Sequence, residues 1–285
     1  MQVVNSLMEE SFKYTSEKNI GMRGDEIGNL MEIVAYCQDE SVKEPVEYRD
    51  ILWEIYVQEG VTFADWLYGG GEGNEEDKRR LMEVLSKKEM VCINDPMTED
   101  VNIGKIHITL GEFPPGVSNV REYIQERREI LSSIRNVTDY ESFMQSCFIN
   151  SCFAVGILSE MKHIHNFPER AKEITKALGI LNDEAITLYQ QYSKSLDKAM
   201  HILSVHLQRE CTPDPKHTKD LIFSFVYSEQ IEGKTVAVTK DIECSPHLKL
   251  IHPGSNLRIY FYWCDAAIGE GKKVLVGRIG RHPYG

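Results

Sequence analysis

The sequence has no Cys-x-x-Cys pair, although it contains seven cysteines. An odd number of cysteines without paired spacing argues against both a zinc ribbon and a disulfide framework. Cys147 and Cys152 lie in an apolar segment, where a free cysteine behaves as a small hydrophobic residue. We therefore expect reduced thiols, with no metal site and no cofactor built on cysteine.

Long hydrophobic runs are also missing. The most apolar stretch, 147–161, is interrupted by Asn150 and Ser151, and it is shorter than the roughly 18 residues that a membrane-spanning helix needs. The first twelve residues lack the basic start of a secretory signal and contain Glu9 and Glu10. These features predict a cytoplasmic protein that does not cross a membrane.

Positive charge is scarce overall, since 32 Lys and Arg face 44 Asp and Glu, for a net charge of −12. Residues 1–100 hold 10 basic and 23 acidic side chains, whereas the segment from Ser245 onward has a net charge of +4. A negative surface repels nucleic acid, so only the C-terminal segment is expected to contact RNA. The acidic first third is either a solvated surface or a surface for a basic protein partner.

What the sequence does contain is the composition of a globular protein, with 42% hydrophobic residues over 285 positions. Apolar residues recur every three or four positions in 27–37 and 49–58, which predicts two amphipathic helices. Alternation in 100–111 predicts a strand or short hairpin. Helical spacing then returns, and from about residue 117 it predicts a bundle with antiparallel helices that are broken near Gly179 and Asn182.

Two patterns in this region suggest sites that the local chemistry argues against. The glycine-rich loop 69–74 precedes a helix but lacks the phosphate-loop motif and carries acidic residues, so it does not predict a nucleotide site. His163 and His165, like His201 and His206, lack the i, i+4 spacing that brings two imidazoles onto one metal ion. Solvent-exposed or half-buried histidines are the simpler interpretation.

The composition changes near residue 211, where a polar segment with two prolines, 211–217, has the character of a linker. Four β-branched or aromatic runs follow, and they are punctuated by glycine: 221–227, 235–238, 257–263 and 273–279. These runs predict a small antiparallel sheet. The fold class expected is α+β, with a mostly helical region at 1–210 and an antiparallel sheet module at 218–285.

Alternation along the third run predicts that Arg258 and Tyr260 share one face of this sheet. The order of basic segment, glycine turn, Arg-containing strand, second turn and final strand with a basic tail containing His and Tyr resembles the RelE superfamily of bacterial toxins. The resemblance covers residues 246–284 only. It implies metal-independent cleavage of mRNA, in which cationic and aromatic side chains activate the 2′-hydroxyl and stabilise the phosphorane.

The residue types fit this chemistry, because cleavage without a metal ion needs cations near the phosphate and a group that transfers protons near neutral pH. The catalytic residues that the resemblance implies are Arg258, Arg278, His282 and Tyr284. The substrate-binding residues that it implies are His247, Lys249, Tyr260 and Arg281.

The function expected is that of a bacterial toxin or antiphage-defence effector that cleaves RNA. Members of the RelE superfamily are short and basic, whereas this module follows some 210 residues and is only slightly positive, so loss of cleavage is an alternative. A non-catalytic interaction protein of a defence or toxin–antitoxin complex, in a homo- or hetero-oligomer, also fits. The acidic first third could also inhibit the basic C-terminal segment in cis.

Overall fold

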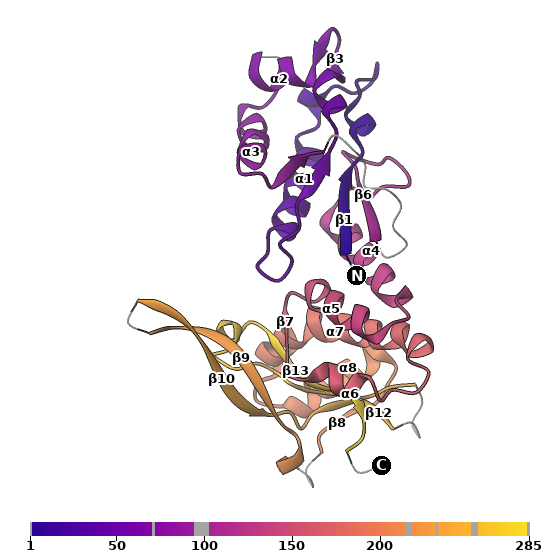
Figure 1. Ribbon diagram of the computed structural model, residues 1–285, viewed down its shortest axis with the longest axis vertical. Coiled ribbons are helices and arrows are strands. Elements are labelled where there is room, and N and C mark those ends of the chain that lie inside the picture. The colour runs from indigo at the N-terminus through magenta and orange to yellow at the C-terminus, as the bar shows by residue number, and fades with distance from the viewer. Residues whose placement is uncertain are drawn as a thin grey trace. The chain divides into compact units, whose positions relative to one another are not determined.

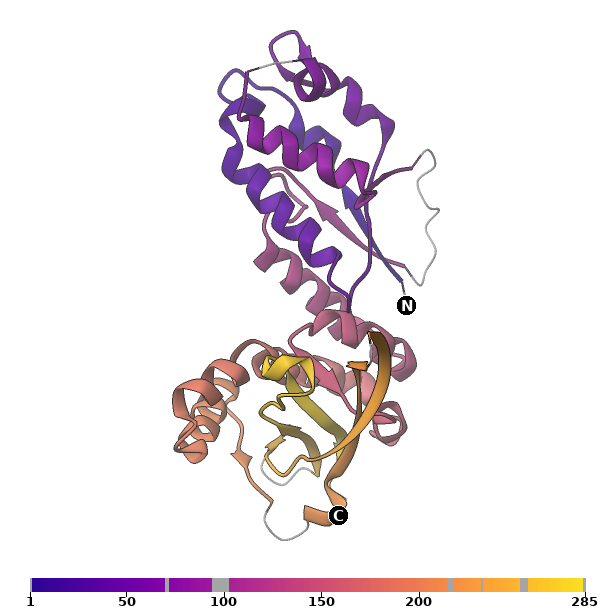
Figure 2. The same cartoon turned by 90° about the vertical axis from the view of Figure 1, so that its left-hand side faces the viewer.

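The chain contains both helices and strands throughout (Figure 1, Figure 2). The computed structural model describes residues 2–69, 72–93, 103–214, 218–231, 233–251 and 256–283. Its internal contacts divide the chain into an N-terminal unit, Met1–Ile130, and a C-terminal unit, Leu131–Gly285. Each unit has its own sheet, and the two are described separately.

The N-terminal unit is built on a four-stranded sheet in the order β5-β2-β1-β6, in which all neighbours are parallel. Its strands are β1 (Gln2–Leu7), β2 (Val46–Tyr48), β5 (Met90–Cys92) and β6 (Ile103–Ile108). A two-stranded hairpin, β3 (Tyr56–Gln58) and β4 (Val61–Thr62), completes the strands described for this unit. The helices are α1 (Gly24–Cys37), α2 (Phe63–Gly69), α3 (Glu75–Ser86) and α4 (Val120–Ser133), which runs across the boundary between the units.

The parallel sheet adds strands to a region that the sequence predicted to be mostly helical. The predicted helix at 27–37 is part of α1 and the predicted strand at 100–111 contains β6, but 49–58 forms a short 3-10 helix and strand β3. Strands β1, β2 and β5 were not predicted, because β2 and β5 have only three residues each and because parallel strands bury both faces, which removes the polar–apolar alternation. In β1, for example, Val3, Val4 and Asn5 are all buried.

The C-terminal unit contains a five-stranded sheet in the order β7-β13-β12-β11-β8. Only the β13–β7 pair is parallel, and the other pairs are antiparallel. The strands are β7 (Ser151–Phe153), β8 (Cys211–Thr212), β11 (His247–Lys249), β12 (Leu257–Tyr262) and β13 (Val274–Arg281). A long antiparallel hairpin, β9 (Ile222–Ile231) and β10 (Lys234–Glu243), projects beyond this sheet (Figure 1).

Four helices accompany the sheet: α5 (Val137–Cys147), α6 (Ile157–Met161), α7 (Phe167–Tyr192) and α8 (Leu196–Leu207). Helix α7 continues through Gly179 and Asn182, where a break was expected. The reason is a tertiary contact, since the buried Asn182 side chain accepts hydrogen bonds from the Asn150 N–H at 2.9 Å and the Ser151 hydroxyl at 3.0 Å. Asn182, a residue type that favours helix ends, therefore stabilises the start of β7 from within the helix.

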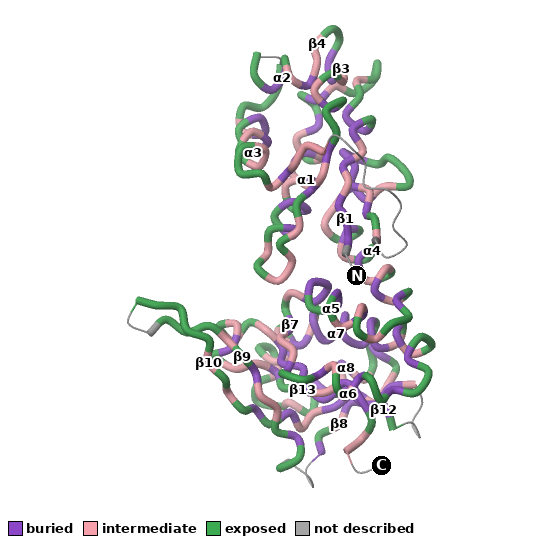
Figure 3. Tube along the Cα trace, in the orientation of Figure 1, coloured by how far each residue is buried: buried purple, intermediate pink, exposed green. Residues whose placement is uncertain are grey.

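The boundary between the units also differs from the one suggested by the proline-containing segment near residue 211. Part of that segment is β8, which pairs with β11 as an edge strand of the C-terminal sheet. Strand β7, from the predicted helical bundle, pairs with β13 at the opposite edge. Helices α5–α8 therefore belong with the sheet module, and buried positions run through both (Figure 3). No helix in the described part of the chain is long and apolar enough to span a bilayer.

Candidate functional site

The residues predicted to act on RNA come from three adjacent strands of the five-stranded sheet. In β12, Arg258 and Tyr260 are two positions apart and therefore point to the same face. The register places His247 and Lys249 of β11 opposite Tyr260 and Arg258. On the other side of β12, Arg278 of β13 pairs with Tyr260. The sheet thus brings these predicted residues onto one face.

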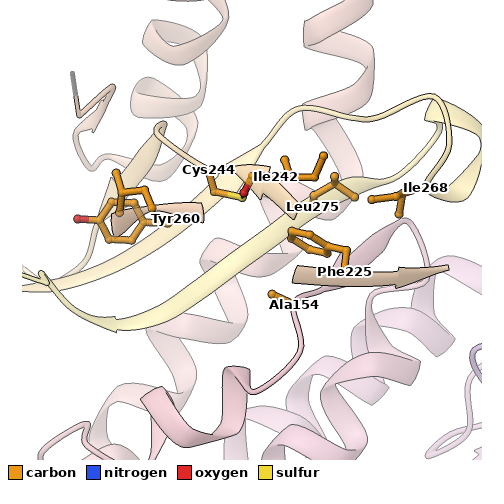
Figure 4. Close-up of a cluster of buried hydrophobic side chains, with 8 residues drawn as sticks. Ala154, Phe225, Ile242, Cys244, Tyr260, Ile268 and Leu275 are labelled. Carbon is orange, nitrogen blue, oxygen red and sulfur yellow. The ribbon is translucent and has the colours of Figure 1, made fainter. Parts of the chain in front are cut away.

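Part of this face is covered by the base of the β9–β10 hairpin. The pairing of β12 with β13 shifts by one residue after Tyr260, which leaves Gly277 as the extra residue. A Cβ atom at Gly277 would lie 2.4 Å from Phe223 of the hairpin, so glycine permits this close packing. Phe225 and Ile242 of the hairpin join Tyr260 in one buried cluster (Figure 4). The face is therefore an interior surface over part of its length.

Tyr260 lies at the centre of the predicted residues. Its ring lies 5.0 Å from the ring of His247 and 6.4 Å from that of His282, measured between centroids. Burial raises the pKa of Tyr260 to about 12, so its hydroxyl keeps its proton at neutral pH. Among the described residues, that hydroxyl has no hydrogen-bond partner. The Tyr260 hydroxyl is therefore a buried hydrogen-bond donor that has no acceptor in the described part of the chain.

His247 is 5% exposed, and desolvation lowers its pKa to about 4, an effect that the charges of Arg258 and Lys249 reinforce. Its imidazole is consequently neutral at pH 7, so the imidazolium form that acts as a general acid is absent. Within the described part of the chain, its Nδ1 atom has no hydrogen-bond partner. The substrate-binding role predicted for His247 would have to use this neutral form.

His282, just after β13, is the more accessible histidine, with 25% of its side chain exposed. Its Nε2 atom lies 3.4 Å from the Oδ2 atom of Asp214. The Asp214 backbone is fixed by hydrogen bonds with Ser245, and the His282 N–H donates to the Asn256 carbonyl at 2.7 Å. A carboxylate beside an imidazole orients the ring and favours one tautomer, so this pair is suited to proton transfer.

Arg258 does not have the position expected for a surface phosphate clamp. It is 7% exposed, and its Nη1 atom donates to the carbonyl of Leu257 at 3.0 Å. Burial lowers the pKa of Arg258, but an arginine stays charged at neutral pH. The alternation that placed Arg258 beside Tyr260 is correct. That face is nevertheless buried at both residues.

The remaining predicted cations differ in their partners. Arg278 Nη2 lies 2.7 Å from Glu160 Oε2 in α6, and Lys249 Nζ lies 2.7 Å from Glu210 Oε2. Arg281, at the end of β13, is exposed. Partly exposed positive charge is thus available at the end of the sheet, beside His282.

Sequence reasoning missed the acidic partners of these residues, Asp214, Glu160 and Glu210. Asp214 stands between two prolines and had the appearance of linker sequence, whereas Glu160 marked only the end of an apolar run. Their contacts join segments that are distant in the sequence, so no local sequence pattern predicts them. Tyr284, predicted as catalytic, lies outside the described residues.

In the described part of the chain, no three His, Cys, Asp or Glu side chains are grouped so that they could hold a metal ion. No protein-family model matches the chain, and neither the curated proteins nor the solved structures include a match. The site is therefore interpreted from its own geometry.

Proposed function

We propose that the chain is a metal-independent endoribonuclease, acting as a toxin or antiphage-defence effector through a RelE-like sheet in its C-terminal unit. The observation that carries this proposal is the convergence of His282, Asp214 and Tyr260 beside the arginines of β12 and β13. A proton-transfer group, a carboxylate that orients it and nearby positive charge are the components that the reaction needs.

The reaction is an internal transesterification of RNA. The 2′-oxygen attacks the adjacent phosphorus while the bond from phosphorus to the 5′-oxygen breaks, which gives a 2′,3′-cyclic phosphate and a 5′-hydroxyl. One proton leaves the 2′-hydroxyl and one is delivered to the departing 5′-oxygen, so the two ends balance without net consumption of water.

Each accessible residue takes a definite role in this proposal. His282, oriented by Asp214, accepts the proton of the 2′-hydroxyl. Arg278 stabilises the negative charge that develops on the phosphate, and Arg281 binds the RNA backbone beside it. Tyr284 is proposed from the sequence as the donor to the 5′-oxygen. Tyr260, at the centre of the buried residues of the same face, packs beside the His282 ring and helps to hold it in place.

The test uses the purified full-length protein, single-stranded RNA and EDTA, with the product ends identified chemically. We expect His282→Ala to lower the cleavage rate constant by about 10²- to 10⁴-fold, the usual contribution of a positioned acid or base. His206→Ala is the matched control, because His206 is exposed on α8 and contacts Glu184 at 2.5 Å. Equal rates for the two variants, or no cleavage by the unmodified protein, would refute the assignment.

A second candidate is a non-catalytic interaction protein of a defence or toxin–antitoxin complex. It is favoured by the burial of Arg258, Tyr260 and His247, together with exposed apolar residues on the projecting hairpin. These residues include Val226, 54% exposed, and Val236, 41% exposed. The acidic N-terminal unit would then bind a basic partner. Loss of complex formation in Val226→Lys, with no RNA cleavage by any form of the protein, would support this candidate.

A further inference from the structure

A small cavity lies at the end of the five-stranded sheet where β12 begins and β13 ends. Its volume is about 210 Å³, and its apolar wall is formed by Ile164, Ile251 and Leu257. This volume is below the range of roughly 300–1,000 Å³ typical of pockets for drug-sized ligands. It suits one phosphate group with part of its sugar.

The charged groups around this cavity are all basic. Arg170 of α7, Arg281 of β13 and the imidazole of His165 line it, and no Asp or Glu is among the described residues that do so. Within the described chain, none of these three side chains has an ion-pair partner. Two arginines from separate segments, together with an imidazole that can donate a hydrogen bond, favour an anion in this cavity.

A neighbouring cavity on the same helix shows that this arrangement is not a general property of α7. That second cavity, of about 340 Å³, is lined by Lys172, Lys176 and Arg209, but also by Glu169 and Glu173. Arg209 is already paired with Glu173 at 2.9 Å. Positive charge there is largely balanced by carboxylates of the same cavity, whereas no carboxylate lines the cavity of Arg170 and Arg281 among the described residues.

The position of the cavity connects it with the proposed reaction. Arg281 directly precedes His282, and Leu257 directly precedes Arg258. Leu257 and Arg281 are also paired across the sheet, so both belong to the face opposite Arg258. The cavity and His282 therefore lie at the same end of the sheet, on its two faces.

We propose that Arg170, Arg281 and His165 form a binding subsite for a backbone phosphate of single-stranded RNA, next to the phosphate at which the chain is cleaved. This inference rests on the proposed ribonuclease function and adds residues from the α6–α7 region that no sequence pattern indicated. Arginine suits this role because its planar group can bind two phosphate oxygens at once.

The experiment measures binding of the full-length protein to a 2′-O-methyl RNA oligonucleotide, which binds but cannot be cleaved. We expect Arg170→Gln to raise the Kd about 5- to 20-fold. The slope of log K against log salt concentration should become shallower by about 0.7, which corresponds to one lost phosphate contact on a single strand. Lys172→Gln is the matched control, since it removes the same charge from the same helix at the neighbouring cavity. It should change the Kd less than 2-fold.

The outcomes separate the subsite from the proposed reaction. If Arg170→Gln weakens oligonucleotide binding but the unmodified protein cleaves no RNA, the subsite stands and the ribonuclease proposal fails. If RNA is cleaved but Arg170→Gln and Lys172→Gln bind equally, the subsite is refuted. Binding of inorganic phosphate or a 5′-mononucleotide that depends on Arg170, without oligonucleotide binding, would overturn the assignment to RNA.

Discussion

Compared with the polar cluster around Tyr260 in the C-terminal unit, the polar cluster around Tyr123 in the N-terminal unit has most of its hydrogen bonds met. There, the Tyr123 hydroxyl donates to Asn5 Oδ1 of β1 at 2.7 Å and accepts from Arg127 Nη1 at 2.9 Å. Arg127 in turn contacts both carboxylate oxygens of Glu44, at 2.5 and 3.1 Å. These residues link α4, β1 and the segment before β2.

In the C-terminal unit, the buried polar atoms on the predicted face that lack partners among the described residues include the Tyr260 hydroxyl, His247 Nδ1 and Arg278 Nε. An unsatisfied buried polar group costs about 1–3 kcal/mol, so it persists where it has a use beyond folding or where water satisfies it. The comparison therefore separates two kinds of buried polar cluster. A closed network holds a fold together, whereas an open one identifies the place to look for function.

The largest effect on folding should follow from breaking the closed network. Arg127→Leu leaves Glu44 and the Tyr123 hydroxyl without their partner, and we expect a loss of about 3 kcal/mol in the free energy of unfolding of the N-terminal unit. Urea titration followed by hydrogen exchange on peptides of each unit measures this. Arg80→Ala, at an exposed pair with Glu76, is the control and should cost less than about 0.5 kcal/mol. A loss below about 1 kcal/mol for Arg127→Leu would mean that the network is not structural.

A second effect, somewhat smaller, concerns pH and the open cluster. The pKa of His247 is about 4 in the folded protein, below the ordinary value of about 6.5 expected after unfolding. As the pH falls from 6.5 to 4, the unfolded chain binds the proton first, so the C-terminal unit loses stability, by at most about 3 kcal/mol. Above pH 6.5 and below pH 4, this residue adds no further pH dependence.

Unfolding at pH 7, 6 and 5 measures this slope, and His247→Gln should flatten it in the C-terminal unit. His163→Gln, at an exposed position before α7, should leave it unchanged. A slope that persists in His247→Gln would show that another group is responsible.

The sequence predicted the C-terminal strands better than the N-terminal strands, for a physical reason. The strands β9, β10, β12 and β13 are 10, 10, 6 and 8 residues long and rich in β-branched and aromatic residues. Alternation within β12 was enough to place Arg258 beside Tyr260. The N-terminal strands β2 and β5 have only three residues each and pair in parallel, so they offered no comparable pattern.

Burial and partners could not be predicted in the same way. The alternation in β12 did not predict that Arg258 is buried, because the sequence does not reveal that the hairpin packs on part of that face. Asp214 was interpreted as part of a linker. Its contact with His282 could not be predicted, because it joins positions that are 68 residues apart. Side-chain contacts of this kind are determined by the tertiary fold, so they cannot be predicted from local patterns in a single sequence.

The smallest effect gives the sharpest form of the comparison, because it uses the same substitution in both clusters. Tyr123→Phe removes a hydroxyl that serves Asn5 and Arg127, so it should lower the stability of the N-terminal unit by about 1–3 kcal/mol. Tyr260→Phe removes a hydroxyl that has no partner in the described chain, so it should be neutral within about 0.5 kcal/mol, or stabilising. Hydrogen exchange on peptides of each unit measures the change in the free energy of unfolding for both variants. Equal destabilisation by the two variants would show that Tyr260 is satisfied in solution, and the open cluster would then be structural like the closed one.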